Sequence, residues 1–213
     1  MQTSLSKYEL LAEMAGSAQT LLDVGCGGGE LAQPLARERQ AIDGADISLK
    51  RLGERRSLYR NLWELDIEDP SVPIPFGDYS ALIFADVLEH LQDPEKLLHR
   101  MSKQINDNAT LIVSLPNVAF LENRLGLLRG RWEYQDVGIL DRTHLHFYTL
   151  KTARELIESS GFKIEKTVAE VPALSNPVKQ KIFTQAAACW PEMFAIGWAF
   201  KAKSISFQAD PSK

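Results

Sequence analysis

A glycine-rich turn followed by two aspartates carries the clearest chemical signal in this sequence. The apolar run 21–24 leads into Gly25-Cys26-Gly27-Gly28-Gly29, and glycines let a backbone come close to a ligand because no side chain stands between them. Asp46 and Asp66 each follow a further apolar run. Because open α/β sheets bind ligands at the carboxyl ends of their strands, these residues predict a cofactor site at one sheet edge.

The glycine spacing separates two classes of cofactor that use such a turn. A dinucleotide turn has a third small residue, which lets helix and strand pack closely under a pyrophosphate. Here Glu30 stands in that place. S-adenosylmethionine (SAM) has no phosphate, so an acidic side chain is tolerated there. Its ammonium and ribose hydroxyls need acceptors, which Asp23 and Asp46 would supply, and the two lie near the spacing of roughly 20 residues expected for a ribose-binding acid.

Four motifs resemble those of class I SAM-dependent methyltransferases: residues 22–29, 46–48, 66–67 and 84–91. The resemblance runs from about residue 20 to residue 166. It implies a Rossmann-like, doubly wound α/β sheet of seven strands, mostly parallel, with SAM as cofactor. In that family the glycine turn packs on the methionine part of SAM, the acid after the second strand holds the ribose, and an acid with an apolar neighbour contacts the adenine. The cofactor-binding residues implied here are Asp23, Gly25, Cys26, Gly27, Asp46, Ile47, Asp66, Ile67 and Asp86.

The elements that must position these residues alternate as a parallel sheet requires. Helices are predicted from an opening segment ended by Gly16, after the N-cap Asp93, and from Thr149 to Gly161. The opening helix would bury Leu5, Tyr8, Leu11, Ala12 and Ala15. Strands are predicted at 20–25, 41–45, 61–65, 79–85, 110–115, 162–168 and 198–207. The pattern predicts one domain over residues 1–213.

Composition and charge narrow the class of protein. The chain has 213 residues and a net charge of −4 with no run of Lys or Arg, so no nucleic-acid partner is expected. Arginines at 51, 55, 56 and 60 are interpreted as a solvated helix face. Two cysteines give no disulfide framework. The first residues lack the apolar region of a signal peptide, and a cytoplasmic location is expected.

An insertion at 116–148 interrupts the alternation after the fifth strand. It is longer than a plain connection of about 2 to 6 residues, and long connections at this sheet edge carry function. Its polar and aromatic side chains suit a pocket or lid for a polar acceptor. The predicted substrate-binding residues are Asn117, Arg124, Trp132, Tyr134, Arg142, His146 and Tyr148.

Two histidines of the insertion are candidates for catalysis. In an extended segment Arg142, His144, His146 and Tyr148 would share one face. His144 is predicted as a general base for an attacking hydroxyl or amine, oriented by Asp141. The alternative is that these side chains only tie the lid to the core. A metal at His144 and His146 would need a third ligand, and no metal is predicted.

His90 is the third catalytic candidate. It ends the run 86–90 after the fourth strand, where the resemblance implies a junction between cofactor and acceptor, with Asp86 near the sulfonium. The alternative is that Glu89 and His90 only begin a turn before Asp93.

The acceptor is predicted from what the sequence lacks. No Asn-Pro-Pro-Tyr-type motif follows the fourth strand, which argues against methylation of amide or exocyclic nitrogen. O-methylation of a small molecule or sugar is therefore favoured, with N-methylation next. Segments 114–117 and 138–145 resemble a bacterial group that includes polysaccharide-linked methyltransferases and MetW. That resemblance also admits a SAM-binding partner protein without turnover of its own.

The segment 175–197 is rich in apolar residues but has no run of about 18 that could span a membrane. It is predicted to be a helical cover over the sheet or the acceptor pocket. The alternatives are a homodimer face and a patch for peripheral membrane contact.

Overall fold

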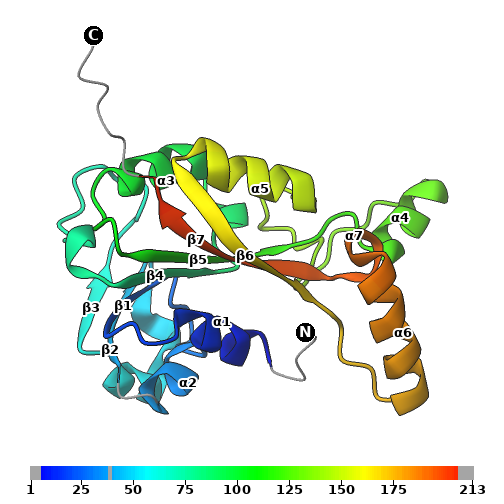
Figure 1. The fold of residues 1–213 in the computed structure, drawn as a ribbon, viewed down its shortest axis with the longest axis horizontal. Helices are drawn as coiled ribbons and strands as arrows, with labels where there is room; N and C mark the ends of the chain where they lie inside the picture. Colours follow the sequence, from blue (N-terminus) through cyan, green and yellow to red (C-terminus); the bar gives the residue numbers. More distant parts are fainter. Residues whose placement is uncertain (1–5, 38–39, 206–213) are drawn as a thin grey trace, which may run out of the picture.

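A computed structural model describes residues 6–37 and 40–205. Its centre is one seven-stranded sheet in the order β3-β2-β1-β4-β5-β7-β6 (Figure 1). Strands β1 to β5 run parallel, whereas β7 is antiparallel to both β5 and β6. The predicted α/β fold class is confirmed. The strands are β1 (Thr20–Val24), β2 (Ala41–Asp46), β3 (Asn61–Glu64), β4 (Ala81–Ala85), β5 (Thr110–Pro116), β6 (Phe162–Glu170) and β7 (Gly197–Ser204).

Helices cover both faces of the sheet (Figure 1). One apolar layer packs α3 and α5 on the sheet, and the other packs α1 and α2 on its opposite face. The α-helices are α1 (Lys7–Ala15), α2 (Ala32–Arg37), α3 (Pro94–Ser102), α4 (Leu121–Leu128), α5 (Leu150–Ser159), α6 (Pro177–Cys189) and α7 (Pro191–Phe194). Short 3-10 turns are η1 (Leu49–Arg51), η2 (Gly53–Leu58), η3 (Phe76–Asp78) and η4 (Leu88–His90).

The predicted helix signals hold where side chains cap the backbone. Asp93 accepts from the Lys96 amide at the start of α3, and Thr149 forms a capping box with Thr152 at the start of α5. Helix α1 begins at a Ser6 capping box and ends at Gly16. Its buried side chains are Leu10, Leu11, Met14 and Ala15.

The structure differs from the prediction in three details. Tyr8 was predicted on the buried face of α1 but is 36% exposed, and Leu5 lies outside the described residues. Strand β4 begins at Ala81, two residues later than the predicted strand 79–85, because Tyr79 closes the turn η3. The predicted strand 198–207 corresponds to β7 (Gly197–Ser204), and positions 206 and 207 lie outside the described residues.

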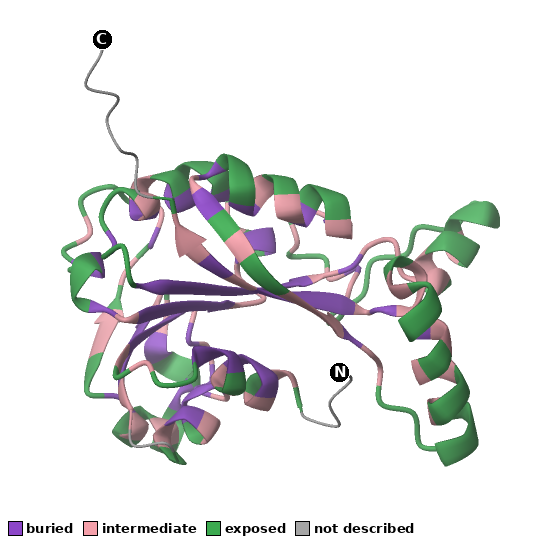
Figure 2. Ribbon diagram, viewed as in Figure 1, coloured by how far each residue is buried: buried purple, intermediate pink, exposed green. Residues whose placement is uncertain are grey.

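The insertion and the segment before β7 form one end of the molecule. Helices α4, α6 and α7 project there, away from the helices on the sheet (Figure 1), and α4 and α6 are mostly exposed (Figure 2). The segment 175–197 is helical as predicted, but Ala187 is the one buried residue of α6. Helix α6 therefore does not cover the sheet, and its role as a cover over the acceptor pocket stays a prediction. Among the described residues, no helix has both the length and the apolar character to cross a membrane.

Candidate functional site

The carboxyl ends of the parallel strands bring the predicted residues to one edge. Gly25 follows β1, Asp46 ends β2, Asp66 follows β3 and Asp86 follows β4. Parallel pairing in register sets these ends side by side. This is the edge at which open α/β sheets bind ligands.

The glycine turn is shaped by close packing against the strand ends. Gly25 has φ 69°, and a Cβ placed there would lie 2.5 Å from Cγ2 of Val87. Only glycine therefore fits this position without displacing a neighbour. The Gly25 amide donates to the Ala45 carbonyl at 2.7 Å, which ties the turn to β2. Cys26 is buried, and burial raises the pKa of its thiol to about 12, so it is an unreactive part of the turn.

Asp46 braces the turn from the next strand. One carboxylate oxygen accepts from the Gly27 amide at 2.8 Å, and the other accepts from the Ser48 amide at 2.9 Å. A carboxylate has about four lone-pair sites, so two stay open toward a ligand. Ile47 beside it is 74% exposed, an apolar surface that a flat ring could cover.

The Asp23 side chain is buried and is not exposed at the sheet edge. It accepts a 2.7 Å hydrogen bond from the Tyr59 hydroxyl. Burial raises the pKa of Asp23 to about 7, although the Tyr59 hydrogen bond opposes the shift. Its predicted contact with the SAM ammonium stays a prediction, and the contact visible here is with Tyr59.

Two of the four arginines interpreted as a solvated face also hold other parts of the chain. Arg55 donates to the Gly28 carbonyl at 2.9 Å and pairs with Glu30 at 3.3 Å, so it ties down the far side of the turn. Arg60 forms a two-pronged pair with the buried Asp43 at 3.0 and 2.7 Å. Both side chains are still exposed in part, at 39% for Arg55 and 51% for Arg60. The interpretation missed their partners, which come from other parts of the chain.

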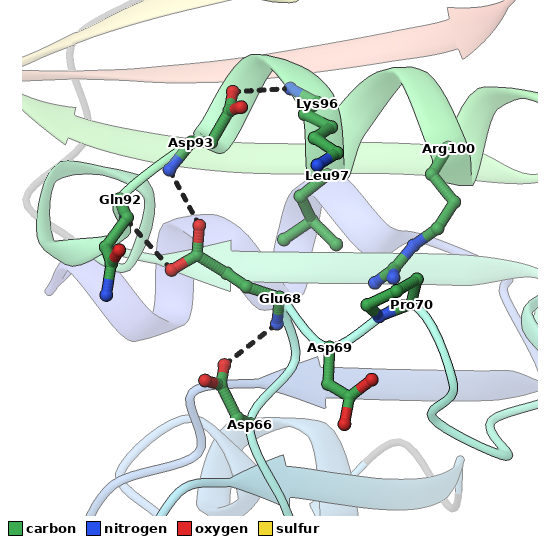
Figure 3. Close-up of a pocket in the computed structure, with 9 residues that line it drawn as sticks. All are labelled: Asp66, Glu68, Asp69, Pro70, Gln92, Asp93, Lys96, Leu97 and Arg100. Carbon is green, nitrogen blue, oxygen red and sulfur yellow. Dashed lines mark hydrogen bonds between the residues drawn. The ribbon is translucent and has the colours of Figure 1, made fainter.

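Asp66 borders a hollow of about 510 Å³ beside the start of α3 (Figure 3). Its carboxylate accepts from the Glu68 amide at 2.9 Å. The Glu68 carboxylate in turn accepts from the amides of Gln92 and Asp93. Arg100 donates to the carbonyl of the buried Ile67 at 2.6 Å. These bonds fix the 66–67 pair that the resemblance assigns to the adenine.

Asp86 adopts a backbone conformation that side chains rarely take, with φ 54°. Such strain persists where neighbours hold it and is frequent at functional sites. Ser114 on β5 donates to the Asp86 carboxylate at 2.6 Å and accepts from its amide at 3.1 Å. Lys7 of α1 forms an ion pair with the same carboxylate.

A second hollow, of about 260 Å³, opens beside Asp86 and contains the catalytic candidates. Glu170 at the end of β6 also borders it and lies 3.7 Å from the Lys7 ammonium. Burial raises the pKa of Glu170 to about 7, although Lys7 opposes the shift. Burial would lower the pKa of Lys7, but the two carboxylates outweigh it and raise that pKa. The lining residues are Lys7, Asp86, Glu89, His90, Pro116, Gly138, Ile139, Asp141, His144, Glu170, Ile196 and Gly197.

His144 is held with one ring nitrogen directed inward. Its Nδ1 lies 3.1 Å from the Ile139 carbonyl. Because a carbonyl only accepts, Nδ1 carries the proton and Nε2 is free. Burial, with repulsion from His90, lowers the pKa of His144, so the ring is neutral at pH 7. Contrary to the prediction, the Asp141 carboxylate does not hydrogen-bond to the ring but accepts from the amide and hydroxyl of Thr143. The Asp141 carbonyl accepts from the His144 amide at 3.1 Å, so Asp141 holds the backbone of His144 rather than its ring.

Glu89 faces His144 across 4.0 Å, measured from Oε1 to Nε2. Both of its carboxyl oxygens are buried without a hydrogen-bond partner among the described residues. Burial raises the pKa of Glu89 well above its ordinary value, and the nearby Asp86 carboxylate raises it further. A buried polar group left without a partner costs about 1–3 kcal/mol, which indicates a group that a ligand completes.

His90 stands at the outer side of this cluster. Its ring lies 4.7 Å from that of His144, and Nδ1 is 3.1 Å from the Thr143 hydroxyl. One atom each of Glu89, His90 and His144 lies within 4.8 Å of the others, the geometry that a cation would need. The absence of a metal stays a prediction.

The predicted substrate-binding residues of the insertion do not line this hollow. Asn117 is buried, and its side-chain amide donates hydrogen bonds to the carbonyls of Glu192 and Ala195. Arg124 is exposed on α4, and Trp132 packs edge-on to Tyr134 at 6.5 Å outside the hollow. Their contact with an acceptor stays a prediction that this geometry does not support.

The prediction that residues 142, 144, 146 and 148 share one face was wrong. The backbone turns at 142–143 instead of staying extended. Arg142 consequently points to solvent and pairs with Asp136 at 3.0 Å. His146 contacts the Gln92 carbonyl, and Tyr148 is buried, with its pKa raised by burial.

Sequence reasoning missed the groups that complete the hollow. Lys7 lies before the first motif, and Glu170 lies after the last one, so neither belongs to a pattern. Glu89 belongs to the 84–91 motif and to the turn given as its alternative, and neither assigns it a role in the hollow. An acid inside the apolar run 87–91 was the available signal, because buried acids are rare without a role.

Comparison with known proteins gives consistent matches. A family model described as a methyltransferase domain matches residues 4–167. The ubiquinone biosynthesis O-methyltransferase of Azoarcus sp. (strain BH72) is 28% identical over 175 residues, which are 75% of this chain and 74% of that protein. The mitochondrial protein of the same name from Bos taurus is 25% identical over 92% of this chain, which spans 53% of its length.

Solved structures agree on the fold. A SAM-dependent methyltransferase from Archaeoglobus fulgidus superposes with a TM-score of 0.64 at 18% identity, covering 93% of this chain and 95% of that one. At this identity the likeness establishes the fold alone.

Proposed function

The chain belongs to the class I SAM-dependent methyltransferases, and from this premise we propose that it transfers the SAM methyl group to a hydroxyl oxygen of a small-molecule acceptor. The observation that carries the proposal is the free Nε2 of His144 in the hollow beside Asp86. A neutral imidazole at this place can accept the proton of an attacking hydroxyl. The relatives are named as O-methyltransferases, which favours an enzyme over a partner protein without turnover.

The residues of the sheet edge fit SAM. A Cβ at Gly27 would meet no atom closer than the Gly25 carbonyl oxygen at 3.8 Å, so the bare backbone there leaves room for the methionine part. The open lone pairs of Asp46 suit two ribose hydroxyls. When bound, SAM supplies an already activated methyl group. The protein therefore needs to align the acceptor, exclude water and remove one proton.

Each residue of the hollow has a role in this proposal. His144 takes the hydroxyl proton at Nε2, and the Ile139 carbonyl keeps the other nitrogen protonated. The Glu89 carboxyl hydrogen-bonds to a hydroxyl of the acceptor molecule, which gives this buried group the partner that it lacks. Asp86, fixed by Ser114 and Lys7, lies at the junction with the cofactor.

The names of the relatives favour oxygen as the methylated atom, since both are called O-methyltransferases. A saccharide hydroxyl is the alternative acceptor, and an amine is the next. A hollow of about 260 Å³ with buried acids and a neutral histidine suits a compact hydroxylated molecule. The chemistry shared by phenols and sugars is the hydroxyl that His144 deprotonates.

The test is an acceptor screen with methyl-labelled SAM. Phenols and catechols, monosaccharides, and primary amines form three matched panels, and mass spectrometry locates the transferred label. The proposal expects label on oxygen. Transfer to the amine panel alone would refute it.

A further inference from the structure

Exposed apolar side chains gather at one end of the molecule. In the described part of the chain, eight of the fourteen large apolar side chains that are exposed fall within residues 121–132 and 174–190, here called the α4–α6 surface. They are Leu125, Leu127, Leu128, Trp132, Leu174, Val178, Ile182 and Trp190. Soluble proteins rarely expose a large contiguous apolar patch unless something binds there.

The two segments are connected in space. Phe120, just before α4, packs against Phe183 of α6 with ring centroids 6.2 Å apart, and both helices project from the same end of the molecule (Figure 1). Leu128 is 83% exposed and Ile182 is 62% exposed. Val178 and Ile182 stand four positions apart, on one side of α6. These exposed side chains are therefore not partly buried residues at the edge of the hydrophobic core.

The charge of this surface distinguishes between two possible binding partners, a second copy of the chain and an anionic bilayer. Its segments hold five basic residues and one acid, in a chain whose net charge is −4. All five basic side chains are exposed, and none pairs with an acid among the described residues. They are Arg124, Arg129, Arg131, Lys179 and Lys181. In a symmetric dimer this face would meet its own positive charge, whereas apolar side chains flanked by cations match an anionic bilayer.

We propose that the α4–α6 surface docks on an anionic lipid bilayer, with its apolar side chains in the interface and its cations at the headgroups. The surface adjoins the hollow of the active site, because Pro116 shortly before α4 and Ile196 just after α7 both line that hollow. Docking brings the part of the hollow lined by Pro116 and Ile196 near the lipid. The inference does not depend on which acceptor is methylated.

Vesicle co-sedimentation of the whole chain tests the proposal. Binding is expected to phosphatidylcholine vesicles that contain phosphatidylglycerol, and to be far weaker without it. Replacing both lysines, Lys179→Gln with Lys181→Gln, is expected to weaken binding about 30-fold, from about 1 kcal/mol per cation. Ile182→Glu is expected to abolish binding. Ile205→Glu is the matched control, since Ile205 is similarly exposed, at 53%, and lies outside the surface.

Other outcomes would overturn the proposal. They are equal binding to both vesicle types, no binding to either, or equal effects of Ile182→Glu and Ile205→Glu. A dimer in sedimentation equilibrium that Ile182→Glu dissociates would assign the surface to a second copy instead. Calorimetric binding of S-adenosylhomocysteine (SAH) by every variant verifies the fold, and a failure of that binding would bear on the cofactor site rather than on the surface.

Discussion

Asp46→Asn is expected to weaken SAH binding by about 10- to 100-fold. Both carboxylate oxygens of Asp46 already accept backbone amides, from Gly27 and Ser48. An asparagine has a single acceptor oxygen, so its amide nitrogen would face one of these N–H groups. The ligand then loses a charge-assisted hydrogen bond to its ribose, which is worth about 1.5–3 kcal/mol, and 1.4 kcal/mol corresponds to a tenfold change in affinity.

Isothermal titration with SAH measures the effect. Asp107→Asn is the matched control, because it removes the same charge from an exposed position away from the sheet edge. Circular dichroism verifies that both variants fold. Affinity within threefold of the parent protein for Asp46→Asn would refute the reasoning, since Asp46 would then only brace the turn.

Further predictions concern Asp23 and the glycine turn. Burial raises the pKa of Asp23 to about 7 in the folded chain, from an ordinary value of 3.8, so the folded state binds this proton more tightly than the unfolded state does. Its contribution to the free energy of unfolding is then full below about pH 4 and is lost as the pH rises through 7. Asp23→Asn keeps an acceptor for Tyr59. It is expected to raise the free energy of unfolding of the ligand-free protein by a few kcal/mol at pH 8 and to leave it nearly unchanged at pH 4. Urea unfolding at the two pH values measures the effect, and an equal effect at both would contradict the prediction. Gly25→Ala is expected to lower the free energy of unfolding by roughly 2 kcal/mol or more, because it combines left-handed strain with a clash against Val87. Gly53→Ala carries similar strain at φ 53° with open space around the new Cβ, so equal losses in the two variants would show that the clash contributes nothing.

Local patterns predicted the scaffold because each rests on nearby residues. The turn at Gly25, the cap at Asp93 and the capping box at Thr149 all lie within a few residues of the groups that they serve. The alternation of strand and helix then leaves few topologies. The sheet edge followed, and with it the positions of Asp46 and Asp86.

The interior of the hollow could not be predicted, because distant parts of the chain build it. Lys7 and Asp86 are 79 positions apart, and Glu170 joins them from the end of β6. The insertion misled for a related reason. Backbone bonds from Leu145 and His146 to the Glu89 carbonyl turn that loop inward at His144, and alternation in the sequence cannot show a turn that depends on such a bond.

The most direct test of the proposed chemistry compares His144→Gln with His146→Gln on the best hydroxyl acceptor. His144 lines the hollow, whereas His146 lies nearby and outside it. His144→Gln is expected to lower kcat about 100- to 10,000-fold, the usual contribution of a general base, and to leave SAH affinity unchanged. His146→Gln is expected to keep most of the activity. Equal turnover by the two variants would contradict the assignment of His144 as the base.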